Sequence, residues 1–273
     1  MIRLPDVDLP AATAAGLQSY QDDVDDAPSY IERVQRAKQR FSSRNRKSDP
    51  VFSVVRKSIR TLCYGPVRCG YCEDSCADEI EHIRPKDLYP GDVFRWSNYL
   101  YACGPCNGPK NNKYKVFTGP GAETLSDITR PHGAQVTPPP NGKDALINPR
   151  HENPLMYLQL DLVDTFQFVP IGAADSVEEA RGRYTIEVLG LNRDVLCTAR
   201  RSAFNGFLNG LKLFYTESTG TADLDELARI RTSVVSTPHP TVWEEMKRQR
   251  DALPGLHKLF DAVPEALDWR PQA

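Results

Sequence analysis

The chain has 273 residues, of which 40% are hydrophobic and 26% are charged, and its formal net charge is −2. These proportions are typical of a soluble globular protein. No apolar run approaches the roughly 20 residues that a membrane-spanning helix needs. The first residues also lack the basic and apolar regions of a secretory signal, which predicts a cytoplasmic protein with no membrane partner. Because the charges nearly balance, a surface that binds nucleic acid must be a local patch.

The N-terminal part of the chain predicts an arm followed by two helices. Residues 1–27 are acidic and rich in proline and alanine, which indicates an irregular arm with room for one short helix. The first helix begins after Ser29, a plausible N-cap, and the second begins at Pro50. Apolar residues recur at helical spacing: Ile31, Val34, Ala37 and Phe41 in the first helix, and Phe52, Val55, Ile59 and Leu62 in the second. Their many Lys and Arg residues fit either a solvated face or a face that contacts phosphate.

The cysteines indicate a metal site. Seven cysteines in a chain without an export signal favour metal binding over disulfides. Four of them form two C-x-x-C pairs, Cys69 with Cys72 and Cys103 with Cys106. Four thiolates at this spacing predict a closed, structural zinc site. The alternatives are reduced cysteines without metal and a redox dithiol, and both are disfavoured because two pairs face each other.

A second chemical feature lies between the cysteine pairs, where Glu81 directly precedes His82. Neighbouring side chains on a strand point to opposite faces, so both residues can serve one site only if the strand ends or bends there. Pro85 supplies such an end. Carboxylate and amide oxygens suit Mg²⁺ or Mn²⁺, and a neutral histidine can take a proton from water. Together with an amide oxygen from Asn98 or Asn107, which follow it in the chain, the doublet predicts a hydrolytic metal site.

The rest of the chain predicts a loop, a hairpin and several helices. Residues 118–145 are rich in Gly, Pro, Ser and Thr, which predicts a long loop and the best candidate for a domain boundary. Alternating apolar residues from Leu158 to Phe168 predict two strands of a hairpin. Helices are predicted from Asn192 or Asp194 to about Tyr215, over DLDELARIRTSVV, and from Thr241 with a break at Pro254. The expected fold class is α+β and mostly helical, in four regions: an arm (1–27), N-terminal helices with the metal-binding core (28–117), the loop (118–145) and a mainly helical region with the hairpin (146–273).

The central motif resembles a known nuclease family. E-H-I-x-P, followed by N-x-x-x-x-C-x-x-C-N-x-x-K, is similar to the zinc-stapled ββα-metal (HNH) nucleases. The resemblance implies that His82 is the general base, that Glu81 and Asn107 bind the catalytic divalent ion, and that Asn98 orients the loop or the base. Glu81 stands where the family often has Asp, and Asn107 stands where it often has His. Four cations are candidates for contacts with nucleic acid: Arg84, Lys86, Lys110 and Lys113.

A longer pattern resembles one branch of that family. The nuclease motif is followed by LINP-x-x-E-x-P and GLNR-x-x-L, and the whole stretch from residue 50 to about residue 215 is similar to PtuB-type HNH proteins of bacterial anti-phage systems. The resemblance implies a regulated nuclease that works beside a PtuA-like ABC-type ATPase and, in some systems, a retron. DNA is favoured over RNA as the substrate. The alternative hypothesis is a non-catalytic, zinc-ribbon-like subunit that binds nucleic acid or protein, although such a subunit would not need the Glu81-His82 doublet.

Overall fold

The computed structural model describes residues 1–65, 67–220 and 223–271. About half of these residues are helical, and the strands form three small sheets, so the chain belongs to the α+β class. No helix in the described ranges combines the length and hydrophobicity needed to cross a membrane.

The N-terminal segment is more ordered than its composition indicated. Helix α1 (Ala11–Asp25) occupies most of the predicted irregular arm. Its inward face carries Leu17, Gln21 and Val24, all of which are buried. The acidic residues that suggested an arm lie mainly on the outward face, so α1 is held by packing rather than by a strong local signal.

Helices α2 (Tyr30–Arg44) and α3 (Pro50–Arg60) begin where the sequence predicted. Ser29 and Glu32 form a capping box, in which each side chain accepts a hydrogen bond from the other residue's backbone N–H. Asp49 caps α3 by accepting hydrogen bonds from the N–H groups of Val51 and Phe52. The apolar faces of α1, α2 and α3 share one core cluster with two strands of the central region.

The central region contains two strands and a short helix. Strands β1 (Glu79–His82) and β2 (Tyr99–Ala102) pair antiparallel, with His82 opposite Tyr99. Helix α4 (Gly104–Lys110) follows β2 directly and contacts β1. The strand expected to carry the Glu81-His82 doublet and to end near Pro85 is therefore present, and the apolar residues before Cys103 form the second strand.

The predicted long loop contains strands, which corrects that prediction. Strand β3 (Lys115–Thr118) pairs with β4 (Thr124–Asp127) on one side and with β5 (Lys143–Asp144) on the other. The two ends of the range 118–145 are therefore held in a three-stranded sheet, while residues 128–142 have no regular secondary structure, as the loop prediction expected. The Gly and Pro residues that predicted a loop lie mostly between the short strands.

The C-terminal half contains the predicted hairpin and helices, with one helix more than expected. Strands β6 (Leu158–Leu160) and β7 (Phe168–Pro170) pair antiparallel. Helix α5 was not predicted as a separate element; it begins after its N-cap Ser176 and ends at Gly190, whose φ of 57° favours glycine. The break at Pro254 is confirmed. The helices of this half are α5 (Val177–Leu189), α6 (Asp194–Ser218), α7 (Leu224–Val235), α8 (Pro240–Arg248) and α9 (Pro254–Ala262).

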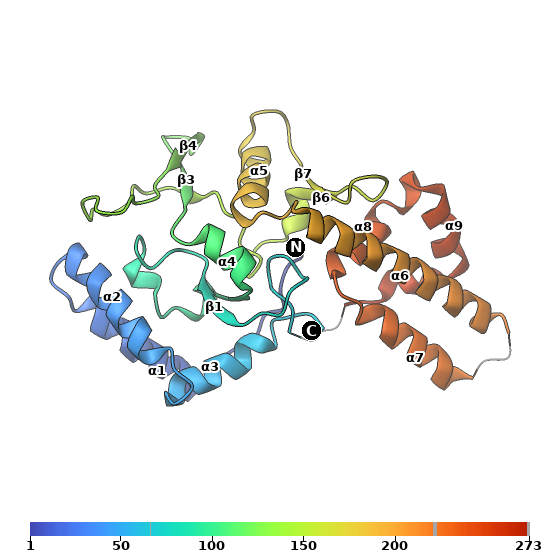
Figure 1. Cartoon of the computed structure of the whole chain (residues 1–273), viewed down its shortest axis with the longest axis horizontal. Helices are drawn as coiled ribbons and strands as arrows, with labels where there is room; N and C mark the ends of the chain where they lie inside the picture. The colour runs from blue at the N-terminus through green and yellow to red at the C-terminus, as the bar shows by residue number, and fades with distance from the viewer. Residues whose placement is uncertain (66, 221–222, 272–273) are drawn as a thin grey trace.

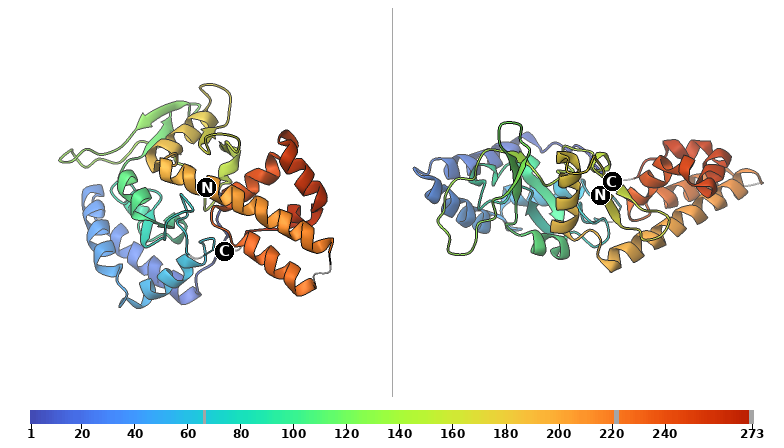
Figure 2. Two further views of the ribbon diagram at one scale, coloured as in Figure 1. Left: turned by 45° about the vertical axis from the view of Figure 1, so that its right-hand side comes forward. Right: turned by 90° about the horizontal axis from the view of Figure 1, so that it is seen from above.

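The elements form two lobes, as Figures 1 and 2 show. Helices α1 to α3, the central region and the three-stranded sheet lie in one lobe, and α6 to α9 lie in the other, with α5 and the β6–β7 hairpin between them. The N-terminus lies near the junction of the lobes (Figure 1), where the amino group of Met1 donates a hydrogen bond of 2.6 Å to Thr241. The candidate site lies in the first lobe, away from the long helix α6.

Candidate functional site

The four cysteines of the two C-x-x-C pairs form one cluster. Their sulfur atoms lie within 4.8 Å of one another, and all four residues are buried. A tetrahedral zinc site with Zn–S bonds of about 2.3 Å would separate its sulfurs by about 3.8 Å, which is the distance between the Sγ atoms of Cys72 and Cys103. The donors fit a zinc ion, and the cluster would then fasten the chain before β1 to the first turn of α4. Cys76 is exposed and lies outside this cluster.

His82 is held at the end of β1 by aromatic rings and one backbone carbonyl. Its ring centroid lies 4.3 Å from that of Phe41 in α2 and 5.3 Å from that of Tyr99 in β2. Its Nε2 atom lies 2.9 Å from the carbonyl oxygen of Val93. A carbonyl can only accept, so Nε2 carries the proton and Nδ1 carries the lone pair in the neutral ring. Nδ1 has no hydrogen-bond partner among the described residues.

The surroundings of His82 keep its ring neutral. Burial lowers the pKa of the imidazole most, and the charges of Lys86 and Lys110 lower it further, to about 3. The hydrogen bond to Val93 acts in the opposite direction but is the weaker influence. Near neutral pH the ring is therefore uncharged, and its free nitrogen can accept a proton.

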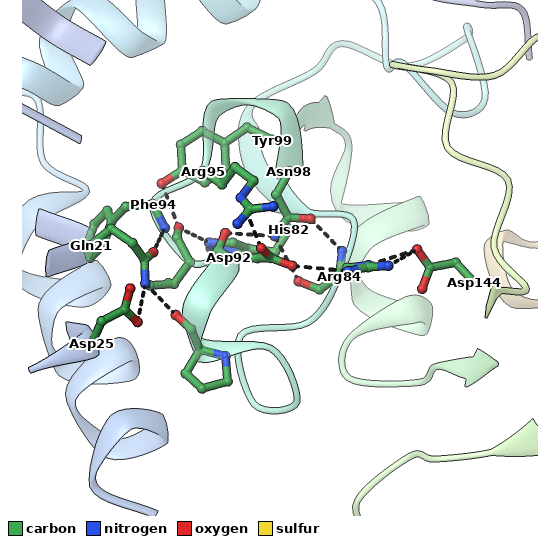
Figure 3. A network of polar contacts seen from close by, with 12 residues as sticks. Gln21, Asp25, His82, Arg84, Asp92, Phe94, Arg95, Asn98, Tyr99 and Asp144 are labelled. Carbon is green, nitrogen blue, oxygen red and sulfur yellow. Dashed lines mark hydrogen bonds and ion pairs between the residues drawn. The ribbon is translucent and has the colours of Figure 1, made fainter. Parts of the chain in front are cut away.

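The carbonyl that orients His82 is itself held by two other elements. The hydroxyl of Tyr99 donates a second hydrogen bond of 2.8 Å to the Val93 oxygen. The next N–H along the chain, that of Phe94, donates to the side chain of Gln21 in α1 at 3.0 Å. The Gln21 amide also donates to the carbonyl of Pro90 at 3.1 Å and to Asp25 at 3.0 Å. Figure 3 shows this network, in which α1 fixes both ends of the turn that carries Val93.

This arrangement predicts that Gln21→Met changes the balance between the two tautomers of the neutral His82 ring. Methionine keeps the length and helix propensity of glutamine but cannot bond Phe94 or Pro90. Each buried backbone group that loses its partner costs about 1–3 kcal/mol, so the turn should loosen. We expect the ¹⁵N shifts of the His82 ring to move from one tautomer to a mixture of two. The matched control is Gln18→Met on the exposed face of the same helix, where the side chain bonds only Asp22; equal spectra for the two variants would contradict the prediction.

Glu81 and Lys110 form a buried ion pair beneath the site. The exposed fractions are 5% for Glu81 and 1% for Lys110, and the Lys110 ammonium also donates to the carbonyl oxygen of His82 at 2.9 Å. Burial raises the pKa of the Glu81 carboxyl, and the neighbouring Lys110 opposes that shift. Lys110 therefore joins α4 to β1. The prediction that it contacts nucleic acid is wrong for this structure, because both its charge and its donors are committed inside the protein.

The predicted ligand Asn107 faces the same cavity from α4. Its amide donates a hydrogen bond of 2.5 Å to Glu79, which lies two residues before Glu81 and so on the same face of β1. A cavity of about 610 Å³ is lined by both glutamates, His82 and Asn107, with Lys86 on its wall. The structure thus brings Glu81, His82 and Asn107 to one hollow, although they come from a strand and a helix separated in sequence.

Asn98 and Arg84 lie outside that cavity. The Asn98 side chain accepts a hydrogen bond from the Arg84 N–H at 2.8 Å and donates to the carbonyls of Arg84 and Asp92 at 3.1 and 3.0 Å. It therefore ties the end of β1 to the turn that carries Val93 (Figure 3). The guanidinium of Arg84 is held by Asp144 at 2.8 Å and by Asp92 at 3.4 Å. These pairs lie on the wall of a different hollow, and the Arg84 side chain is 37% exposed, so its contact with nucleic acid stays a prediction.

Three contributors to the site were missed in the sequence. Glu79 could have been found, since it precedes Glu81 by two positions on a predicted strand. The Val93 carbonyl and Gln21 carried no signal, because a backbone oxygen has no sequence signature and Gln21 lies in a helix that was not expected. Arg84, Lys86 and Lys113 remain candidates for contacts with nucleic acid.

Comparison with known proteins gives one informative match. No protein-family model matches the chain. A stretch of 68 residues is 38% identical to the Septu protein PtuB of Bacillus thuringiensis, and it covers 22% of this chain and 26% of that protein. The match spans only about a quarter of PtuB. Part of this chain is therefore similar to the PtuB protein of the Septu system.

Proposed function

We propose that this protein is a metal-dependent endonuclease of the HNH type that hydrolyses phosphodiester bonds in nucleic acid. One observation carries the proposal: Glu81, His82 and Asn107 line a single cavity, and the Val93 carbonyl leaves Nδ1 of His82 free to accept a proton. Strand β1 supplies Glu81 and His82, and α4 supplies Asn107. The elements follow one another in the order β1, β2, α4, and the four-cysteine cluster joins the segment before β1 to α4. This order is the one that a ββα-metal core would have.

His82 would act as the general base. Its Nδ1 would take a proton from a water molecule in the cavity while Nε2 stays bound to Val93, so the ring would not need to turn. The low pKa of the free imidazole would rise when a phosphodiester enters, because a negative charge favours the protonated ring. Asn98 would hold the turn that carries Val93 in a fixed position relative to the end of β1.

Glu81 and Asn107 would hold one divalent ion, with Glu79 beside them. Carboxylate and amide oxygens are the donors that Mg²⁺ and Mn²⁺ prefer. When bound, such an ion supplies polarisation of a phosphoryl oxygen and stabilisation of the leaving oxygen. Lys110 already neutralises Glu81, so the carboxylate would be shared between the ammonium and the ion.

That same ion pair favours a second candidate function. Because Lys110 satisfies the charge of Glu81 without a metal ion, the chain could serve as a non-catalytic, zinc-ribbon-like subunit that binds nucleic acid or a partner protein. The two functions differ in one requirement, since only the nuclease needs a hard divalent ion in the cavity.

Metal removal separates the two functions. We expect brief EDTA treatment to abolish cleavage of plasmid, single-stranded DNA or total RNA, and added Mg²⁺ or Mn²⁺ to restore it, while the buried cysteine cluster keeps its zinc. Cleavage that continues unchanged in EDTA would contradict the metal mechanism. Each substrate should be tested with and without a PtuA-like ATPase, because a silent nuclease could need its partner.

The similarity to PtuB supports a role in anti-phage defence beside a PtuA-like ATPase. We further propose retron components as partners in some systems. We expect cells that carry the wild-type protein and its neighbouring ATPase to lower the plating efficiency of a sensitive phage. The His82→Ala protein should give no protection. Equal protection by both proteins would separate the defence role from the proposed chemistry.

A further inference from the structure

A second hollow lies beside the candidate cavity. Its volume is about 710 Å³, and it shares Gly108, Asn111 and Asn112 with the cavity that contains His82. One wall is Lys38 of α2, and the opposite wall is the segment 129–136, which follows β4. The two hollows therefore meet at the C-terminal end of α4.

The second hollow is basic where the first is acidic. The first is lined by three acidic residues and two cations: Asp78, Glu79, Glu81, Arg56 and Lys86. The second is lined by Lys38, Lys113 and Arg130 against one acid, Asp87.

The charge of that acid is already compensated. The Asp87 carboxylate is bound by Lys38 at 2.8 Å and by the amide of Asn112 at 2.5 Å. Lys113 is exposed and forms no ion pair within the described ranges. The acidic hollow that contains His82 is therefore suited to a metal cation, and the neighbouring basic hollow is suited to anions.

Hydrogen bonds from Arg130 hold the segment 129–136, which forms part of the lining of the second hollow. The Arg130 guanidinium donates to the backbone carbonyl of Asp87, to the hydroxyl of Tyr30 at 3.2 Å and to the carbonyl of Thr137 at 2.8 Å. These bonds fasten the segment after β4 to α2 and to the chain that follows β1. The shape of the second hollow is therefore fixed by hydrogen bonds between separate elements of the fold.

The backbone at the meeting point is unusual. Asn111 has a φ of 39° and a ψ of −121°, in a region that side-chain-bearing residues rarely adopt. Such conformations cost about 1–3 kcal/mol each and cluster at functional sites. Here the conformation turns the chain sharply at the end of α4, and Lys113 follows two residues later on the wall of the basic hollow.

We infer that the basic hollow binds the sugar-phosphate backbone of a single-stranded nucleic acid whose neighbouring phosphodiester lies beside His82. This inference rests on the proposed function for the position of the scissile bond. A hollow of this volume has the size of a small-ligand pocket, so it takes up a few nucleotides of one flexible strand, whereas a rigid double helix could enter it with only one of its two strands. Lysine and arginine supply sequence-independent contacts to phosphate, and DNA and RNA strands share that chemistry.

The test measures binding without cutting. All proteins would carry His82→Ala, and fluorescence anisotropy would follow labelled single strands of DNA and of RNA about 12 nucleotides long, a usual site size for such proteins, and a matching duplex. We expect Lys113→Glu to weaken single-strand binding at least tenfold. For Lys113→Ala, the slope of log affinity against log salt should fall by about 0.7, the value for one phosphate contact on a single strand. Lys258→Glu, the same charge change on exposed α9 in the other lobe, should alter neither quantity.

The outcomes distinguish this inference from the proposed function. If Lys113→Glu and Lys258→Glu bind equally, or if duplex competes as well as single strands, the basic hollow is not the strand site, whatever the wild-type protein cleaves. If binding depends on Lys113 but the wild-type protein cleaves nothing, the strand site stands and the proposed hydrolysis fails. If the Lys113→Glu change weakens binding of the DNA strand alone or of the RNA strand alone, the strand whose binding is weakened is the one that occupies the basic hollow.

Discussion

Replacement of His82 by alanine is expected to reduce cleavage by a factor of about 10²–10⁴, the usual contribution of a general base. The alanine variant would lose the only nitrogen in the cavity that the described residues place as a free proton acceptor beside Glu81 and Asn107. Its zinc content should equal that of the wild type, because the ring contacts Val93, Phe41 and Tyr99 and none of the four cysteines. The measurement is the initial rate of cleavage at saturating Mg²⁺, together with metal analysis.

Two controls make this result interpretable. His257→Ala makes the same change on an exposed part of α9, so full activity in that variant would show that the preparation and assay are sound. The His82 ring also packs between Phe41 and Tyr99, so its removal leaves a small cavity. The melting temperature must therefore be compared; a folded His82→Ala protein that cuts at the wild-type rate would show that His82 is not the base.

Replacement of Cys103 by serine is expected to remove zinc and stability together. Structural zinc sites supply about 10–16 kcal/mol of apparent binding energy in small zinc-dependent domains, and this energy is also folding energy. Serine is a poor zinc ligand at neutral pH, so the three remaining thiolates should hold the ion far more weakly. We expect the loss of most bound zinc, a fall of several kcal/mol in the free energy of unfolding, and low solubility.

Cys76→Ser is the matched control for that variant. Cys76 lies four residues after Cys72 but is exposed and outside the cluster, so its replacement should leave zinc content and the denaturation midpoint unchanged. The two variants can be compared by zinc analysis and urea unfolding. A soluble, metal-free Cys103→Ser protein with wild-type stability would remove the structural role of the cluster.

Local signals account for the parts of the fold that were predicted correctly. Ser29 with Glu32 and Asp49 with Pro50 each fix a helix start within four residues of chain. Alternation of apolar residues located the β6–β7 hairpin, and Pro254 began α9. The sheet over residues 115–144 was missed because its strands are two to four residues long and are separated by Gly and Pro.

The candidate site likewise contains features that local sequence patterns predicted and features that they did not. The spacing of Cys69, Cys72, Cys103 and Cys106 was enough to predict one cluster, because two short C-x-x-C turns can face each other in few ways. The place of Asn107 beside Glu81 and His82 was expected from the resemblance and not from a local pattern, because helix α4, which carries Asn107, was not predicted. The role of Lys110 did not follow, since nothing in its local sequence distinguishes it from a lysine that faces solvent.

The sequence by itself determined the two C-x-x-C pairs that could hold a metal ion, the acidic–histidine doublet and the helix starts, since each pair, the doublet and each helix start involves residues within a few positions of one another. Only the tertiary structure decided which ring nitrogen of His82 carries the proton. That choice depends on the Val93 carbonyl, whose position is fixed by a hydrogen bond between Phe94 and Gln21, 73 positions apart in the chain. The tertiary structure also decided that Lys110 is buried against Glu81 and that Lys113 is left facing the basic hollow. Burial and pairing are set by what the rest of the chain brings to a residue, and no local pattern records them.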